Sequence, residues 1–220
     1  MEDSIKIRLY DPKDRLEVRE ISCDTADKGE PVENFFPDRR LIADLLTIYY
    51  TKYESGSLLV AEFNGKVIGY LTGCLDSRRY QKLMAVSIAP FAVLKALFRG
   101  VLFYRKTWRL LKSLFLLWLK GGASREINID DYPAHLHINI RKGFRGKRIG
   151  HRLVEKFMEY MKEKGVSGIH VSVAGNNLLS QKFFEGLGFT QLNRYPTLYC
   201  NAKSHEVGYT IIYAKKFNQK

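Results

Sequence analysis

The stretch His137-Ile-Asn-Ile-Arg-Lys-Gly-Phe-Arg-Gly-Lys-Arg-Ile-Gly150 decides the fold. It connects a predicted strand, residues 134–140, to a helix through a basic turn that contains glycine. The helix is amphipathic, because apolar residues recur in it at four-residue spacing: Ile149, Leu153, Phe157 and Met161. The first N–H groups of a helix have no intrahelical partners, and the helix dipole adds positive potential there. We therefore predict that an anion binds at residues 145–150.

A second segment carries a resemblance to a known family. Asn177-Leu-Leu-Ser-Gln-Lys-Phe-Phe-Glu-Gly-Leu-Gly-Phe189 resembles the N-x-x-A-x-x-F-Y-E-x-x-G-F segment of the GNAT acetyltransferases, and its spacing from Arg145 agrees with that family. Pro133-Ala-His-Leu-His137 and Gly165-Val-Ser-Gly-Ile-His-Val171 resemble a branch of the family with histidines on the two central strands. The resemblance is specific between Tyr132 and Phe189.

The rest of the pattern favours one domain, residues 1–220. Alternation predicts a strand at 5–10, helices follow at 13–21 and after Asp38, and Asn64-Gly65 joins the hairpin strands 58–63 and 67–73. After residues 134–140 come a strand at 166–173, a helix at 178–187 and a final pair of strands. The resemblance implies an α/β fold with a mixed, mostly antiparallel sheet, splayed central strands and helices on both faces. Residues 81–121 are predicted to be a helical insertion between the third and fourth strands.

The resemblance also implies acetyl-CoA as cosubstrate, with no metal. Its pantetheine arm would lie between the splayed strands, in contact with Ile138, Asn139 and Ile140. The pyrophosphate would be held by Arg145, Gly146, Lys147, Arg148, Ile149 and Gly150. The rest of the cofactor would be flanked by Asn177, Ser180 and Phe183.

The sequence departs from the family pattern at two positions. Arg148 stands where the turn usually has its middle glycine, and a backbone N–H can still donate from there if the dihedral angles are helical. Phe184 stands where the family often has a tyrosine that protonates the departing thiolate, so no acid can act from that position. A thiol has a pKa of about 8.5, so the leaving group needs little help.

Transfer of an acetyl group from acetyl-CoA to a primary amine, by direct attack, is the predicted reaction. His135 and His137 share one face of a strand and His170 lies on the neighbouring strand, so His137 and His170 are candidate bases. A backbone N–H at Asn139 or Ile140 is a candidate for stabilising the oxyanion. The alternative for each histidine is a hydrogen-bonded core role. Asp130 and Asp131 could bind the amine or stay in an exposed loop. Tyr195 and Tyr199 could act as acids or only pack.

Basic residues concentrate in two stretches. Eight lie between Lys82 and Lys120 and six between Arg141 and Arg152, with no acidic residue in either, and these fourteen exceed the whole net charge of +13. From Arg105 onward one helical face carries Arg105, Arg109, Lys112, Leu116 and Lys120, and another carries Trp108, Leu111, Phe115, Trp118 and Leu119. We expect the aromatic face to be buried in the protein core or in a homodimer. The alternatives are a mobile lid and peripheral contact with an anionic membrane.

Other classes of protein are less compatible with the sequence. Cys23, Cys74 and Cys200 are odd in number and far apart, which predicts a reducing, cytoplasmic location. The N-terminus has no secretory pattern, and the apolar run Leu83 to Leu94 has 12 residues, fewer than a membrane span needs. Nucleic acid is not an expected partner, because the basic clusters do not form an open face interleaved with aromatic residues. The remaining alternative is a regulatory module that binds acetyl-CoA without turnover.

Overall fold

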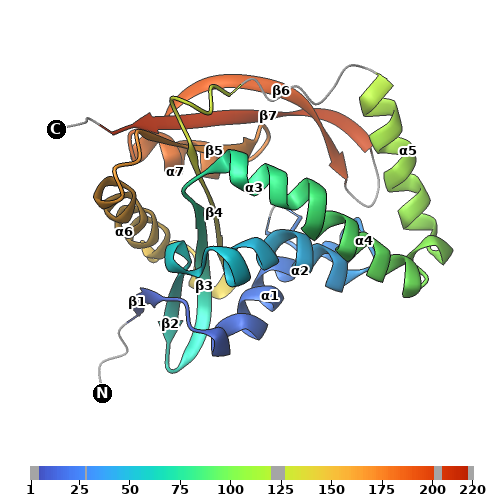
Figure 1. Cartoon of the computed structure of the whole chain (residues 1–220), viewed down its shortest axis with the longest axis horizontal. Helices are drawn as coiled ribbons and strands as arrows, with labels where there is room; N and C mark the ends of the chain where they lie inside the picture. The colour runs from blue at the N-terminus through green and yellow to red at the C-terminus, as the bar shows by residue number, and fades with distance from the viewer. Residues whose placement is uncertain (1–4, 28, 120–126, 201–204, 218–220) are drawn as a thin grey trace.

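The computed structural model describes residues 5–27, 29–119, 127–200 and 205–217. Within them, a seven-stranded sheet has the order β1-β2-β3-β4-β5-β7-β6 (Figure 1). Every neighbouring pair is antiparallel except β4 and β5. The strand bounds are β1 Lys6–Leu9, β2 Leu59–Phe63, β3 Lys66–Cys74, β4 Ala134–Ile140, β5 Gly168–Ala174, β6 Thr190–Cys200 and β7 His205–Lys216. The predicted fold class is confirmed.

Helices cover both faces of the sheet, because its strands bury apolar side chains on each side in turn. On β2, Leu59 and Ala61 pack with helices α6 (Ile149–Glu163) and α7 (Leu178–Gly186). The alternate residue Val60 packs on the opposite side with α1 (Arg15–Asp24) and with Tyr49 and Tyr50. These tyrosines lie in a π-helical turn, η3 (Tyr49–Tyr53), that continues α2 (Arg39–Ile48). The two layers of helices fix the sheet between them.

Strands β4 and β5 separate soon after they meet. Their pairing is limited to Ala134 with Ile169 and His135 with His170. Beyond that point β4 continues along β3, and β5 continues along β7. The two central strands therefore form a fork that opens toward the starts of α6 and α7, which follow β4 and β5 in the chain.

A series of helices connects β3 to β4. It consists of α3 (Ser77–Leu83), η5 (Met84–Ile88), α4 (Ala89–Phe98), η6 (Val101–Phe103) and α5 (Arg105–Leu119), and α5 stands at one end of the molecule in Figure 1. The continuous run Ser77–Phe98 has the length and apolar composition of a membrane-crossing helix, a test that rests on length and composition alone. Its residues Ile88, Ala92 and Ala96 are nevertheless buried against the domain.

The exposure of α5 corrects one of the two places in which its aromatic face was expected to be buried, the core of the protein. Trp108, Leu111 and Phe115 are exposed on the single chain, and the helix instead buries Thr107 and Ser113. Small hydroxyl residues let α5 approach the domain closely, and their Oγ atoms are satisfied by the carbonyls of Val101 and Arg109. The side chains of Trp118 and Leu119, as well as Lys120 and the boundary at 121, lie outside the described residues.

Candidate active site

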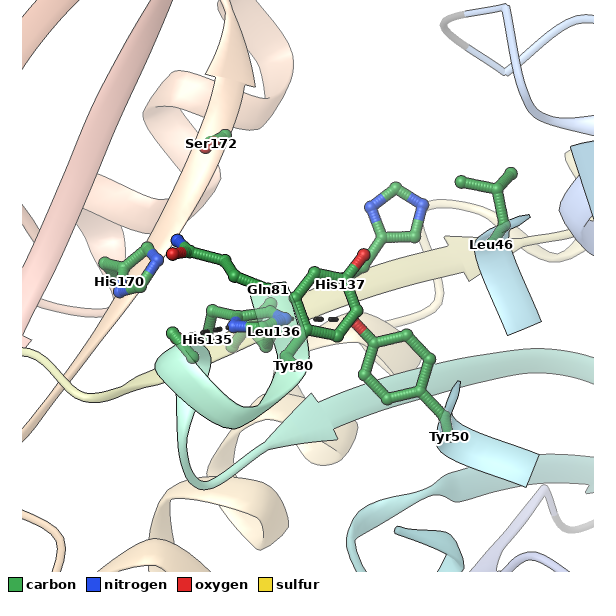
Figure 2. A pocket seen from close by; sticks show the side chains of 10 residues that line it. Leu46, Tyr50, Tyr80, Gln81, His135, Leu136, His137, His170 and Ser172 are labelled. Atoms are coloured by element: carbon green, nitrogen blue, oxygen red, sulfur yellow. Dashed lines mark hydrogen bonds between the residues drawn. The ribbon is translucent and has the colours of Figure 1, made fainter. Parts of the chain in front are cut away.

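A cavity of about 230 Å³ lies at the fork between β4 and β5 (Figure 2). Its lining residues come from both central strands, from α2 and η3, and from α3: Leu46, Tyr50, Ser77, Tyr80, Gln81, His135, Leu136, His137, His170 and Ser172. None of these residues is charged at neutral pH when its histidines are neutral. The three histidines that the sequence placed on the central strands are thus brought together in one pocket.

His135 is held by hydrogen bonds at both ring nitrogens. The Ser77 Oγ donates to the carbonyl of Pro133 at 2.7 Å and lies 2.7 Å from the His135 Nδ1. Because a hydroxyl has one proton, the His135 Nδ1–H must donate to Ser77, which leaves Nε2 as an acceptor. Tyr50 donates to that Nε2 at 2.9 Å (Figure 2). A neutral His135 therefore orients the hydroxyl of Tyr50, and burial raises the pKa of that phenol well above its ordinary value.

His170 lies beside His135 on the facing strand, with the two ring centres 5.6 Å apart. Its Nδ1 donates to the carbonyl of Tyr132 at 2.9 Å, since a carbonyl can only accept. This bond fixes the tautomer in which Nε2 carries the lone pair. Tyr132 precedes β4, so the imidazole of β5 is tethered across the root of the fork.

His137 lies further along β4, where its side chain is exposed to the cavity. Asn139 Nδ2 contacts the His137 Nε2 at 3.1 Å and donates to the Tyr70 hydroxyl at 2.9 Å. The surrounding protein reduces hydration of the charged imidazole, which lowers the pKa of His137 below its ordinary value. His137 is therefore neutral near pH 7 and is positioned by Asn139.

The edge of β4 that faces the fork carries unpaired backbone groups. Arg141 N donates to the Ile68 carbonyl at 2.9 Å, and residues of an antiparallel ladder alternate between bonding a neighbour and facing away. By this alternation the N–H of Asn139 faces β3, whereas the N–H groups of Ile138 and Ile140 face the fork. Of the two expected oxyanion donors, Asn139 and Ile140, only Ile140 points its N–H into the fork. The N–H of Ile138 points the same way.

Helix α6 begins with free backbone donors. Its first residues, Ile149, Gly150 and His151, have no intrahelical acceptors for their N–H groups, and no side chain caps this end. A Cβ added at Gly146 would meet nothing within 4 Å among the described residues, so space remains beside these donors. The helix start is thus an open, positively polarised cradle for an anion.

The backbone at Arg148 differs from the expectation. Its φ of 57° and ψ of 11° are left-handed, not helical. A side chain in this region costs roughly 1–2 kcal/mol, and glycine avoids that cost. The family's glycine at this position therefore has a conformational reason, and Arg148 keeps the same backbone turn under strain.

Only part of the basic stretch remains available to an anion. Arg141 pairs with Asp24 and Lys142 with Glu30. Arg145 donates to the carbonyls of Ile140 and Gly29, so its side chain braces the turn. Lys147 and Arg148 are exposed, and no acidic partner among the described residues neutralises them. The groups available to bind a pyrophosphate are therefore the side chains of Lys147 and Arg148 and the N–H groups at the start of α6.

Helix α7 borders the same end of the fork. The Asn177 Oδ1 accepts from the Ser180 N–H at 3.1 Å, so this pair caps the helix. The Phe183 ring packs on His151 of α6, and a Cβ at Gly150 would lie 3.2 Å from it. Gly150 therefore permits close packing of the two helix starts. Asn177, Ser180 and Phe183 stand near the predicted cofactor channel chiefly as its structural wall.

The other candidate residues lie away from the cavity. Phe184 is 3% exposed and packs against Phe183 and Phe189 in the core. Asp130 pairs with Arg78 and Asp131 with Lys216 in exposed positions. Tyr195 lies on β6 and is absent from the cavity lining, and the side chain of Tyr199 is not described. The loop and packing alternatives fit these residues.

Sequence reasoning missed the aromatic wall of the pocket. The rings of Tyr50 and Tyr80 stack at 5.8 Å, and Tyr80 meets His135 edge-on at 4.7 Å. Tyr50 follows an amphipathic helix and Tyr80 precedes the apolar insertion, so each has the pattern of a packing residue. The one available signal was that both phenols would need hydrogen-bond partners once buried.

Comparisons with known proteins agree with this geometry. Residues 121–189 match the model of the acetyltransferase (GNAT) family. The structure named SsHAT has 21% identity, covers 97% of this chain and 98% of its own, and gives a TM-score of 0.70. An N-acetyltransferase from Staphylococcus aureus Mu50 has 15% identity, coverage of 97% and 98%, and a TM-score of 0.60.

A third solved structure contains the acyl donor. The phosphinothricin acetyltransferase from Sinorhizobium meliloti, in complex with AcCoA, has 15% identity, coverage of 96% and 88%, and a TM-score of 0.57. These likenesses establish the shared fold across nearly the whole chain, and the family match covers the fork, the start of α6 and α7. Residues 121–189 thus match the GNAT acetyltransferase family, and the chain as a whole shares the fold of the acetyltransferases of known structure.

Proposed function

We propose that the protein transfers the acetyl group of acetyl-CoA to a primary amine bound in the cavity at the fork. The observation that carries the proposal is the position of that cavity. It begins where the β4–β5 pairing ends, and its lining residue His137 directly precedes Ile138 on the open edge of β4. A donor lying in the fork and an acceptor in the cavity would meet between His137 and His170.

The residues at the fork suit the chemical groups of acetyl-CoA. Ile138 offers an unpaired backbone edge to an amide-containing arm. The uncapped start of α6 and the space beside Gly146 suit a pyrophosphate, with Lys147 and Arg148 as charged neighbours. Bound there, acetyl-CoA supplies an activated thioester, whose acetyl group passes to the amine nitrogen as the thiolate leaves. The N–H groups of Ile138 and Ile140 are directed to stabilise a developing oxyanion.

The cavity favours a small, uncharged or transiently charged amine. Its volume of about 230 Å³ is below the roughly 300–1,000 Å³ of pockets for drug-sized ligands, which suits a single side chain or the end of a slender molecule. The faces of Tyr50 and Tyr80 can attract an ammonium, and the lining has no carboxylate to keep the amine charged.

His170 is the proposed base. Tyr132 holds its Nδ1–H, so Nε2 can accept the proton that the amine loses as its nitrogen bonds to the acetyl carbon. His137 borders the same space and is neutral near pH 7. Tyr50, whose phenol stays protonated, would protonate the departing thiolate in place of Phe184 by turning its O–H away from the His135 Nε2.

The test measures thiol release from acetyl-CoA with a panel of primary amines. His170→Ala should lower kcat by about 100-fold or more, in line with the usual contribution of a general base. His170→Asn is the matched variant, because its amide N–H can replace Nδ1–H toward Tyr132 but offers no ring lone pair. If the asparagine restored activity, the role of His170 would be structural.

The alternative is an acetyl-CoA-binding regulatory module, which the burial of Phe184 in the core favours. It predicts acetyl-CoA binding by calorimetry and no thiol release with any amine. An active wild-type chain whose Tyr50→Phe variant loses activity at high pH would exclude this module and support Tyr50 as the acid.

A further inference from the structure

Helices α4 and α5 expose an unusual amount of apolar surface. Phe98 is 85% exposed, Phe103 93% and Trp108 59%, and these residues belong to α4, η6 and α5. Soluble monomers rarely expose apolar patches of this kind without a partner. We name this surface the α4–α5 face and define it by its exposed apolar residues: Phe91, Val93, Leu94, Leu97, Phe98, Leu102, Phe103, Trp108, Leu111 and Phe115.

Helical geometry shows that the exposed residues of each helix share a side. In α4 the buried residues Ile88, Ala92 and Ala96 define the inner side, and at 100° per residue Leu94 and Phe98 lie opposite them. In α5, Trp108, Leu111 and Phe115 fall within one narrow sector, which borders buried Thr107 and lies opposite buried Ser113. Arg105, Arg109 and Lys112 occupy the adjoining sector. Both helices therefore present an apolar side to solvent, and α5 borders it with cations.

The tip between the helices is held in place by hydrogen bonds. Gly100, with φ of 74°, allows the turn that follows α4. The Thr107 Oγ1 donates to the Val101 carbonyl at 2.7 Å, and the Trp108 indole N–H donates to the Leu102 carbonyl at 2.8 Å. The exposure of Phe98 and Phe103 is therefore a property of an ordered turn, and their rings form a protruding apolar edge.

The charges on the helices that form the face are of one sign. The sequence has no acidic residue between Lys82 and Lys120, and no carboxylate among the described residues pairs with Lys82, Lys95, Arg105, Arg109 or Lys112. Arg99 is different, because it pairs with Asp38. Lys95 lies 4.4 Å from the centre of the Phe91 ring, with its stem along apolar surface. The face thus complements a partner that is apolar inside and negative at its border.

We propose that the α4–α5 face docks on an anionic lipid membrane, with Phe98, Phe103 and Trp108 entering the interface and the basic residues of α5 contacting headgroups. A second copy of the chain is a poorer partner, because two such faces would bring their cations together without any acid between them. A spanning arrangement is also disfavoured, since it would remove Ile88, Ala92 and Ala96 from the core. This proposal is independent of the proposed acetyl transfer.

Vesicle flotation of the full chain tests the proposal. Vesicles with 30% phosphatidylserine should bind the protein at low salt, vesicles of phosphatidylcholine alone should bind much less, and 1 M salt should release it. Arg109→Glu with Lys112→Glu should weaken binding by about 30-fold or more, at ~1 kcal/mol for each basic residue lost. Lys6→Glu with Lys66→Glu, a pair of exposed lysines on the hairpin side of the sheet, is the charge control and should bind as wild type.

The contribution of the apolar residues to membrane binding is tested by substitutions at exposed positions. Because these side chains are exposed, their replacement should not unfold the protein. Phe98→Ser with Phe103→Ser should abolish flotation, whereas Leu16→Ser, 72% exposed on α1, should not. Fluorescence quenching by brominated lipid should fall in Trp108→Phe. Absence of flotation at low salt would overturn the proposal, as would unchanged flotation of the serine variant. A wild-type dimer that Phe98→Ser and Phe103→Ser convert to a monomer without lipid would identify a self-interface instead.

Discussion

Replacing Arg148 by glycine is expected to stabilise the protein, although it removes a charge near the predicted pyrophosphate site. Arg148 has φ of 57° and ψ of 11°, a conformation that costs a non-glycine residue roughly 1–2 kcal/mol. Glycine avoids this strain but loses more backbone entropy on folding, roughly 0.5–1 kcal/mol. The free energy of unfolding should rise by about 0.5–1 kcal/mol, and Tm by about 1–4 °C for a chain of this length.

Urea unfolding and thermal melting measure the effect, and Lys147→Gly is the matched control. Lys147 is the preceding residue, is also exposed and basic, and has no positive φ, so glycine there brings only the entropic cost. Calorimetry with acetyl-CoA should show that Arg148→Gly keeps its affinity within a few-fold, because the helix N–H groups remain. Equal destabilisation by the two glycine variants would refute the strain argument.

Three further variants separate binding, packing and titration. Gly150→Glu should abolish acetyl-CoA binding, because the glutamate side chain would meet Phe183 and put a carboxylate at the start of α6. Unchanged affinity by calorimetry would place the cofactor elsewhere. Phe184→Tyr should not raise kcat and should lower stability by about 1–3 kcal/mol, the cost of a buried hydroxyl without a partner; a faster enzyme would contradict this. For His137, the surrounding protein reduces hydration of the charged ring and lowers the folded pKa, so as pH falls below about 6.5 the unfolded chain binds a proton first and stability declines. His137→Gln should reduce that decline in urea midpoints between pH 7.5 and 5, and an unaltered slope would contradict the lowered pKa.

The predicted architecture rested on local signals that tertiary contacts did not override. Asn64-Gly65 forms the hairpin turn between β2 and β3, and Asp38 caps α2 by accepting from the Leu41 N–H. Gly165, with φ of 69°, follows the end of α6. In each case the side chain or its absence determines the backbone conformation over a few residues, so sequence alone was sufficient.

Two local expectations failed because the deciding contact lies elsewhere in the chain. The turn at Arg148 is held left-handed by the connection from β4 to α6, and a bulky side chain gave no reason to expect it. The aromatic side of α5 was expected to be buried in the core or in a homodimer, but the domain does not cover it, and Thr107 and Ser113 are the residues that the helix buries. Hydrophobic periodicity identifies the apolar side of a helix but does not show whether the domain itself covers it.

The pocket also could not be assembled from sequence, because its polar network crosses elements far apart in the chain. His135 was predicted from the strand, yet the tautomer that lets it accept from Tyr50 is fixed by Ser77, the first residue of the helices between β3 and β4. Tyr80 and Gln81, one turn later, complete the wall. These helices are therefore part of the pocket at their start and carry the exposed α4–α5 face further on. A perturbation of that face can reach the pocket through α3 and its Ser77–His135 bond, and also through α2, which packs on α4 and carries Leu46 of the pocket wall.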